Sequence, residues 1–237
     1  MLRVNNWTVS SANVGRINRR CQVFSIDCLP MTTRRPGRPR ADAARDLRSL
    51  LLKTSRELLD EAGPGALSMR EVARRAGCTH QAPYHYFQDR ESILAAVVTD
   101  GFDNLARRLA AANDLAPTKG PRAALLASGQ AYIDFALTHP GVFRIMFRPD
   151  VCNPLRFSSL QQAGARAYAE LERLVQIVHG TEASAPLASI YWAHVHGLAC
   201  LLIDGPLAMR LSSPRARRAH LQQVGARFAD LMMGRLA

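Results

Sequence analysis

The clearest periodic pattern along the chain lies between residues 68 and 76. Apolar side chains recur there with the i, i+3, i+4, i+7 spacing of one helix face, at Met69, Val72, Ala73 and Ala76. Ser68 precedes this stripe and Glu71 follows three residues later, which is the order of a capping box. Gly77 stands where a helix can end by turning left-handed. The pattern therefore predicts a short helix that begins after Ser68 and stops at Gly77.

A more polar and aromatic segment follows, His80-Gln81-Ala82-Pro83-Tyr84-His85-Tyr86-Phe87. Thr79 can cap a second helix here, although Pro83 fits only a first turn and favours a slightly later start. Two short helices around a glycine turn are typical of a helix-turn-helix, whose second helix enters the DNA major groove. Phe87 would anchor this helix, and four side chains would face outward, His80, Gln81, Tyr84 and His85. An ordinary surface hairpin of helices is the alternative.

Helical periodicity continues on both sides of this segment. A first helix is expected over about 42–62 with one apolar face, made of Leu47, Leu50, Leu51, Leu58 and Ala62. Leu67 and Met69 would pack behind the second helix of the pair. Asp89 can cap a long helix that reaches about Asn113.

Beyond a linker at residues 115–120, the pattern predicts helices near 121–138, 142–147, 155–178, 185–203 and 214–236. The buried side of the last helix would carry Leu221, Val224, Phe228, Leu231 and Met232. No alternating strand pattern competes with these helices. We therefore expect an all-α fold with a three-helix N-terminal helix-turn-helix domain at 41–90 and a larger helical domain at 114–237, bridged by the long helix.

Composition narrows the class of protein. The formal net charge is +12, and residues 31–90 carry twelve Lys or Arg against seven acids, so basic charge is densest around the expected DNA reader. The five cysteines are irregularly spaced, which argues against a disulfide framework or a metal site and favours a reducing cytoplasm. No uninterrupted run of about 18 apolar residues occurs, so no membrane span is expected.

The first forty residues show no helical periodicity. Residues 1–30 do not read as a signal peptide, and we expect translation to start at Met31. The segment after Met31 is interrupted by prolines and reads as a basic arm, with Arg34, Arg35, Arg38 and Arg40. Such an arm can insert arginine into the DNA minor groove. A solvated tail with non-specific phosphate attraction is the alternative.

The region from about Leu47 to Val98 resembles the DNA-binding domain of the tetracycline-repressor (TetR) family of bacterial regulators. The matching features are the Ser68–Glu71 start, Val72-Ala73, Ala76-Gly77, Tyr84-x-Tyr86-Phe87 and the run from Asp89 to Leu94. At the start of the long helix, the charge of Arg90 and the helix dipole can together hold a DNA phosphate, and the resemblance implies the same role. DNA contacts are expected from Ser68, Arg70, Thr79, His80, Gln81, Tyr84, His85, Tyr86 and Arg90.

The C-terminal half resembles one subclass of these regulators with a Trp-x-x-x-His-Gly signature. The matching stretches are Tyr191 to Gly197 and His139 to Phe147. The expected ligand cavity is mostly apolar and would be lined by Phe143, Met146, Phe147, Trp192 and His196. The alternative is that these residues are ordinary core or lie at a dimer seam. The last two helices are more apolar than an outer layer should be, and the resemblance implies a homodimer through them.

These features favour a ligand-responsive transcriptional regulator that works without a cofactor. The expected partners are a double-stranded DNA operator, a small largely apolar effector and a second copy of the chain. The protein would be a repressor released from a palindromic operator when the effector binds. An architectural DNA-binding protein without a ligand is the alternative. An enzyme is disfavoured because the sequence has no nucleophile motif, phosphate loop or metal-ligand spacing.

Overall fold

The computed structural model describes residues 41–234, and the regular elements in this range are all helical. The all-α prediction is confirmed for this part of the chain. The predicted basic arm with Arg34, Arg35, Arg38 and Arg40, and the predicted start at Met31, lie outside the described residues.

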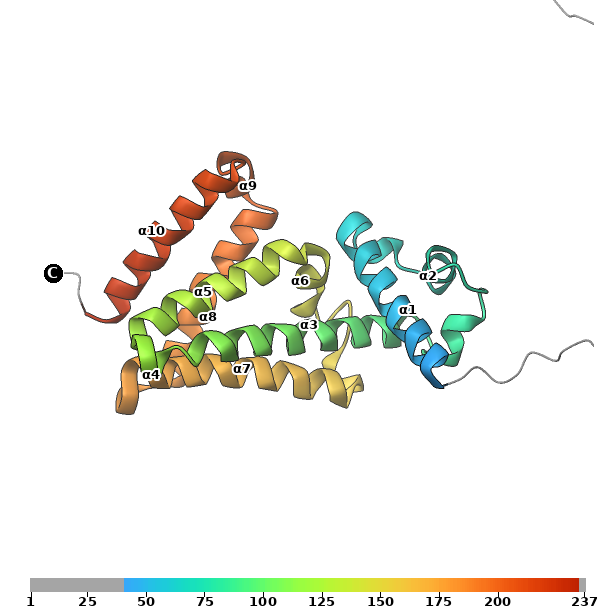
Figure 1. Ribbon diagram of the computed structural model, residues 1–237, viewed down its shortest axis with the longest axis horizontal. Coiled ribbons are helices and arrows are strands. Elements are labelled where there is room, and N and C mark those ends of the chain that lie inside the picture. Colours follow the sequence, from blue (N-terminus) through green and yellow to red (C-terminus); the bar gives the residue numbers. More distant parts are fainter. Residues whose placement is uncertain (1–40, 235–237) are drawn as a thin grey trace, which may run out of the picture. The chain divides into compact units, whose positions relative to one another are not determined.

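Four elements gather at one end of a long helix, α3 (Arg90–Asn113), as Figure 1 shows. They are α1 (Ala41–Ala62), the 3-10 turn η1 (Pro64–Ala66), α2 (Met69–Arg75) and the 3-10 turn η2 (Ala82–His85). Leu67, Met69 and Phe87 are buried between them, as predicted. The predicted apolar face of α1 is wrong at two positions, because Leu50 is 41% exposed and Ala62 is also exposed. Leu51 and Leu58 are buried as predicted, and the adjacent Leu52 and Leu59 are buried with them.

The rest of α3 packs against two further helices, α5 (Pro121–Thr138) and α7 (Ser158–His179). The predicted linker at 115–120 contains one helical turn, α4 (Ala116–Lys119), before α5 begins. A short helix, α6 (Pro140–Met146), follows α5 and also contacts α1. The predicted start of the next helix at residue 155 is wrong, because Asn153 caps the separate 3-10 turn η3 (Pro154–Arg156) and α7 begins after it.

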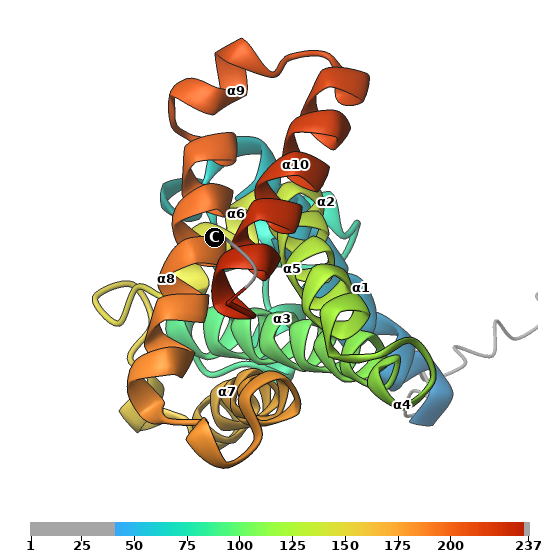
Figure 2. The ribbon, with the colours of Figure 1, turned by 90° about the vertical axis from the view of Figure 1, so that its left-hand side faces the viewer.

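The last four elements of the described residues are η4 (Gly180–Glu182), α8 (Ala185–Ile203), α9 (Pro206–Arg210) and α10 (Pro214–Met232). Figure 2 shows α8 and α10 next to each other, joined by α9, which the sequence did not predict. Leu221 and Ala229 are buried on α10. Leu231 is 56% exposed, so its predicted burial is wrong. The helix does not turn this residue toward α5, the element on which α10 packs.

Candidate functional site

The turn after α2 is fixed by two backbone hydrogen bonds. The Cys78 N–H donates to the carbonyl of Ala73 at 3.1 Å, and the Gly77 N–H donates to the carbonyl of Arg74 at 3.3 Å. This pair of bonds is a Schellman motif, which needs a left-handed residue at its centre. Gly77 has a φ of +66°, a conformation that L side chains rarely adopt. The predicted glycine turn is therefore confirmed.

The predicted capping box at the start of α2 is only half formed. Ser68 accepts a hydrogen bond from the Glu71 N–H at 3.1 Å. The Glu71 carboxylate does not return to the Ser68 backbone, because it binds the side chains of Arg74 and Arg75. Hydrogen bonds from these two arginines lower the pKa of Glu71 to about 2. The side chain of Glu71 therefore organises basic residues on the surface instead of closing the cap.

The second element of the pair is shorter than a full helix. It is the single turn η2, with Gln81 as the residue before it and no side-chain cap. The prediction that Thr79 caps it is wrong, because Pro83 has to lie in the first turn and is buried there. The anchor role of Phe87 is confirmed by its 5% exposure. The Arg48 guanidinium lies 5.6 Å from the centroid of the Phe87 ring.

Four side chains of this segment face outward, as predicted, namely His80, Gln81, Tyr84 and His85. Tyr84 is 52% exposed, and the Gln81 and His80 side chains lie 3.1 Å apart. Tyr86 is half-buried and packs against the core. Ser68, Arg70 and Thr79 are exposed on neighbouring positions. The surface is therefore polar and aromatic above an apolar anchor, which is what base-edge contacts in a groove require.

Arg90 begins α3 beside a complete capping box. The Asp89 side chain accepts from the Ser92 N–H at 2.8 Å, and the Ser92 hydroxyl accepts from the Asp89 N–H at 3.1 Å. The Arg90 side chain donates from Nε to the carbonyl of Leu67 at 2.7 Å and from Nη2 to the carbonyl of Pro64. The sequence did not indicate these two bonds, because their partners are more than twenty residues away. Arg90 thus ties the start of α3 to the segment between α1 and α2 while remaining exposed.

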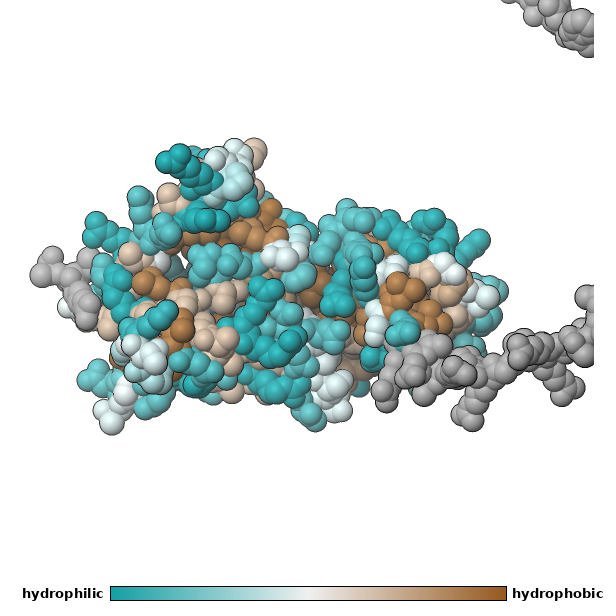
Figure 3. Space-filling view, viewed as in Figure 1, coloured by the Kyte–Doolittle hydropathy of each residue, from teal (hydrophilic) through white to brown (hydrophobic). Residues whose placement is uncertain are grey.

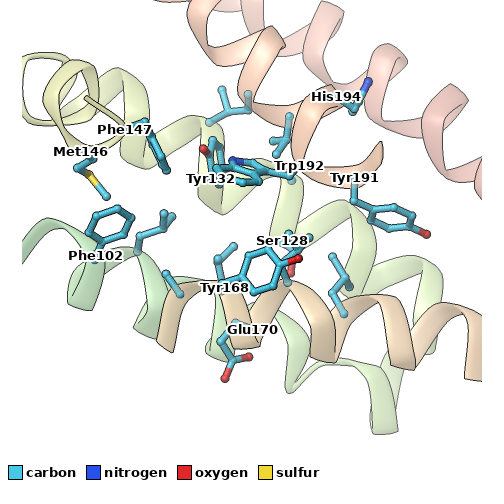
Figure 4. A pocket seen from close by; sticks show the side chains of 18 of the residues that line it. Phe102, Ser128, Tyr132, Met146, Phe147, Tyr168, Glu170, Tyr191, Trp192 and His194 are labelled. Atoms are coloured by element: carbon cyan, nitrogen blue, oxygen red, sulfur yellow. The ribbon is translucent and has the colours of Figure 1, made fainter. Parts of the chain in front are cut away.

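A cavity of about 680 Å³ lies among helices α3, α5, α6, α7, α8 and α10. Figure 4 shows its wall, with Phe102, Met146 and Phe147 at one side of the view and Tyr191 and His194 at the other. Its lining is mainly aliphatic and aromatic. The volume falls within the range of roughly 300–1,000 Å³ that is typical of small-molecule sites.

Three of the five residues predicted to line this cavity do so, namely Met146, Phe147 and Trp192. Phe143 and His196 do not line it. His196 lies behind the wall, where its Nδ1 is 2.9 Å from the hydroxyl of Tyr132 and its ring centroid is 5.2 Å from that of Phe143. Burial lowers the pKa of His196. The spacing of four residues placed Trp192 and His196 on one helix side, but only the first reaches the cavity.

One wall of the cavity carries a buried polar chain that the sequence did not indicate. Ser128 lines the cavity and donates to Oδ1 of Asn113 at 2.6 Å. Nδ2 of Asn113 donates to the Glu170 carbonyl and to its carboxylate, each at 2.9 Å. Asn113 is fully buried and Ser128 is 3% exposed. These residues come from α3, α5 and α7, so no local motif could have revealed them.

Helix α6 connects the cavity wall to α1. At its start, the Gly141 N–H donates to Oδ1 of Asp60 on α1 at 2.7 Å. A Cβ at Gly141 would lie 2.2 Å from the backbone of Leu59, so only glycine permits this close approach. At its end, α6 presents Met146 and the adjoining Phe147 to the cavity. One short helix therefore contacts both the cavity and α1, which in turn packs against α2.

A third surface is the outer side of α8. Ile190, Ala193 and Leu201 are exposed there at helical spacing. On the face turned to the viewer in Figure 3, further hydrophobic residues gather beside α10. A side chain added at Gly197, on the same side, would meet no atom within 4 Å. By length and composition alone, α8 could also cross a membrane, and 22% of its apolar window is buried. The sequence predicted no membrane span, because it has no uninterrupted run of about 18 apolar residues.

Within residues 41–234, no group of three or more His, Cys, Asp or Glu side chains could hold a metal ion.

Comparison with known proteins finds two family matches. Residues 51–97 match the family described as bacterial regulatory proteins, tetR family. Residues 125–228 match the tetracyclin repressor-like C-terminal domain. The first match covers residues 68–90, from the cap of α2 to the start of α3, which we call the reading segment. The second match covers most of the helices around the cavity.

Individual relatives agree with these matches. The chain is 26% identical over 108 residues to the HTH-type transcriptional regulator Rv1816 of Mycobacterium tuberculosis and to Mb1846 of Mycobacterium bovis. The match spans 46% of this chain and 46% of each relative, so it covers about half the length of these curated proteins.

Solved structures resemble a larger part of the chain. A protein of unknown function from Rhodococcus sp. RHA1 has a TM-score of 0.65 at 28% identity, over 79% of this chain and 93% of its own. A bacterial regulatory protein in the tetR family from Rhodococcus RHA1 has a TM-score of 0.60 at 17% identity, over 81% of this chain and 97% of its own. The second likeness shows the fold alone.

Proposed function

Because the chain carries the N-terminal and C-terminal domains of the TetR family, we propose that it is a ligand-responsive transcriptional regulator. It acts as a repressor that leaves a palindromic operator when a small, largely apolar effector binds. The observation that carries this proposal is the exposed polar and aromatic turn at residues 80–85 above the buried anchor Phe87. Such a regulator works in the cytoplasm, where its DNA is.

The proposed DNA contacts fall into two groups. His80, Gln81, Tyr84 and His85 are exposed on the reading turn and face the base edges. Ser68, Arg70, Thr79, Tyr86 and Arg90 lie around it and contact phosphates. Arg90 has two of its donors on carbonyls, and a guanidinium has five. It therefore both braces the reading segment and keeps donors for a phosphate.

The operator is read by a homodimer that forms through α8 and α10. The support is the exposed apolar stripe with Ile190, Ala193 and Leu201, and the open space at Gly197, where a partner helix can approach closely. A two-fold dimer places its reading turns about 34 Å apart, one turn of DNA. We assign the chain to the subclass with the Trp192-x-x-x-His196-Gly197 signature, in which His196 supports the wall from behind.

Effector binding acts on the reading segment through α6. Met146 and Phe147 contact the effector at one end of this helix, and Gly141 is held by Asp60 of α1 at the other. An effector that displaces α6 therefore moves α1 and tilts α3, which changes the separation of the two reading turns. This works only if the effector binds the two arrangements with different affinity. The cavity favours this mechanism over a ligand-free architectural role.

The experiment is an operator-binding titration with Tyr84→Ala. An operator fragment is first selected with the unaltered protein from random-sequence DNA. Because a lost base contact costs roughly 1–3 kcal/mol, we expect binding to be at least about fivefold weaker, with an unchanged dimer by light scattering. The matched control is Gln162→Ala, which removes an exposed side chain of α7 that does not line the cavity and should leave DNA affinity unchanged. Normal operator binding by Tyr84→Ala would contradict the proposal.

A further inference from the structure

The chemistry of the cavity wall narrows the class of effector. We infer that the effector is a largely apolar molecule that carries one hydroxyl or amino hydrogen-bond donor and no negative charge. This inference rests on the proposed function only in taking the cavity as the effector site. It follows from three features of the wall.

The first feature is the absence of a cationic partner. No arginine or lysine is among the residues that line the cavity. Two arginines of the adjoining helix α7 are held by carboxylates, Arg166 by Asp103 and Arg173 by both Asp114 and Glu170. His194 lines the cavity, but burial lowers its pKa and favours the neutral imidazole. An anion placed in such an apolar site without a cation keeps its full desolvation penalty.

The second feature is the direction of the buried hydrogen bonds. The backbone carbonyl of Glu170 can only accept, so the group of Asn113 that faces it at 2.9 Å is the amide nitrogen. The oxygen of Asn113 therefore faces Ser128, and the Ser128 hydroxyl must donate its one hydrogen to it. The Ser128 oxygen can therefore act toward a ligand only as a hydrogen-bond acceptor, through its lone pairs. At Ser128 the wall consequently accepts hydrogen bonds and offers none.

The third feature is the sign of the local charge. Glu170 is the one Asp, Glu, Lys or Arg among the lining residues, and its carboxylate accepts from Asn113 and from Arg173. Because Arg173 also pairs with Asp114, these two carboxylates share one guanidinium and the group keeps a net negative charge. Figure 4 shows Ser128 and Tyr168 in the middle of the view, between the two aromatic groups of the wall, and Glu170 below them with its carboxylate turned away. A donor on the ligand meets acceptors and a negative charge at this place. A carboxylate would meet repulsion there, whereas an alcohol or an amine would be accommodated.

The test compares ligands that differ only at the polar group. The probes are 1-decanol, decylamine, decyl methyl ether and decanoate, titrated calorimetrically into the full-length protein without DNA. We expect the alcohol and the amine to bind, the ether to bind several-fold more weakly, and decanoate to bind at least about tenfold more weakly than the alcohol. Equal affinity for decanoate and decanol, equal affinity for the ether and decanol, or no binding of any probe would each overturn the inference.

Two variants locate the effect. Ser128→Ala should reduce decanol affinity to that of the ether, whereas Thr138→Ala, which removes an exposed hydroxyl from the same helix, should not change it. Glu170→Gln retains an acceptor for Asn113 and removes the charge, so it should weaken decylamine and strengthen decanoate without changing decanol. Glu170→Gln also tests the inference if Ser128→Ala fails to fold. Unchanged selectivity in Glu170→Gln would contradict the assigned charge effect.

Failure of this inference can be told apart from failure of the proposed function. Operator binding without any probe depends on the reading segment and not on the class of effector. A protein that binds its selected operator but prefers decanoate would overturn the effector class alone.

Discussion

The reading segment and the effector cavity are built from contacts of different range. The reading segment is shaped mainly by neighbours in sequence, such as Ser68 with Glu71 and Asp89 with Ser92. The polar wall of the cavity joins Asn113 and Ser128 to Glu170, which lies 57 residues beyond Asn113. A local change can therefore alter the reading turn alone, whereas the cavity depends on how several helices pack together.

The two regions meet at α6. This helix is held to α1 by Gly141 and Asp60 and contributes Met146 and Phe147 to the cavity wall. Side-chain changes that leave α6 in place should thus affect one region only, whereas changes at this contact should affect both. The following substitutions examine this difference.

The largest expected effect comes from removing the anchor of the reading turn. Phe87→Ala should cost roughly 3–5 kcal/mol of unfolding free energy, because it leaves a cavity under η2. Tyr84→Ala removes a ring from the same turn, but Tyr84 is 52% exposed, so stability should change by less than about 0.5 kcal/mol. Urea unfolding of the two variants measures the difference. Equal stability losses would contradict the burial of Phe87 and the exposure of Tyr84.

A smaller loss is expected at the contact between α6 and α1. Gly141→Ala would place Cβ 2.2 Å from the Leu59 backbone, and overpacking of this kind typically costs about 1–3 kcal/mol. Gly164→Ala is the matched control on α7, where an added Cβ meets no atom within 4 Å, and it should stabilise the helix by roughly 0.5–1 kcal/mol.

This pair of glycine variants also examines coupling. Gly141→Ala should weaken the link between effector and operator even under conditions where it remains folded, because α6 can no longer follow α1. If both glycine variants change stability in the same direction, the close contact between α6 and α1 is wrong.

The smallest effect is expected at the local cap. Ser68→Ala removes the acceptor for the Glu71 N–H and should cost about 1 kcal/mol. Ser189→Ala removes a hydroxyl from the exposed part of α8, where it bonds only to a helix carbonyl, and should cost less than about 0.5 kcal/mol. Thermal unfolding of both variants, with effector binding measured in parallel, tests whether the cap acts on the reading segment alone. A loss of effector affinity in Ser68→Ala would contradict the separation of the two regions.

The range of the contacts also explains what could be predicted from the sequence. The glycine turn at Gly77, the burial of Phe87 and the cap at Asp89 are set by residues within a few positions, and all three are confirmed. Thr79 is not the cap of η2, and the later start that Pro83 favoured is confirmed. The half-formed cap at Ser68 was missed because the arginines of α2 compete for Glu71.

Long-range features could not be derived in this way. The bonds of Arg90 to the carbonyls of Leu67 and Pro64 need the folded loop between α1 and α2. Helical spacing placed His196 beside Trp192, but the hydroxyl of Tyr132 on α5 holds it behind the cavity wall. Spacing gives the side of a helix on which a residue lies, and the neighbouring helices decide what that side contacts.

The central claim is that the cavity and the reading turn are coupled, and the most direct measurement is a linkage titration. Operator affinity is measured by fluorescence anisotropy with and without saturating decanol, and decanol affinity is measured with and without saturating operator. Coupling requires that decanol changes the operator affinity by the same factor by which the operator changes the decanol affinity. We predict that each ligand weakens the binding of the other. Decanol that binds in the cavity while operator affinity stays unchanged would contradict the account.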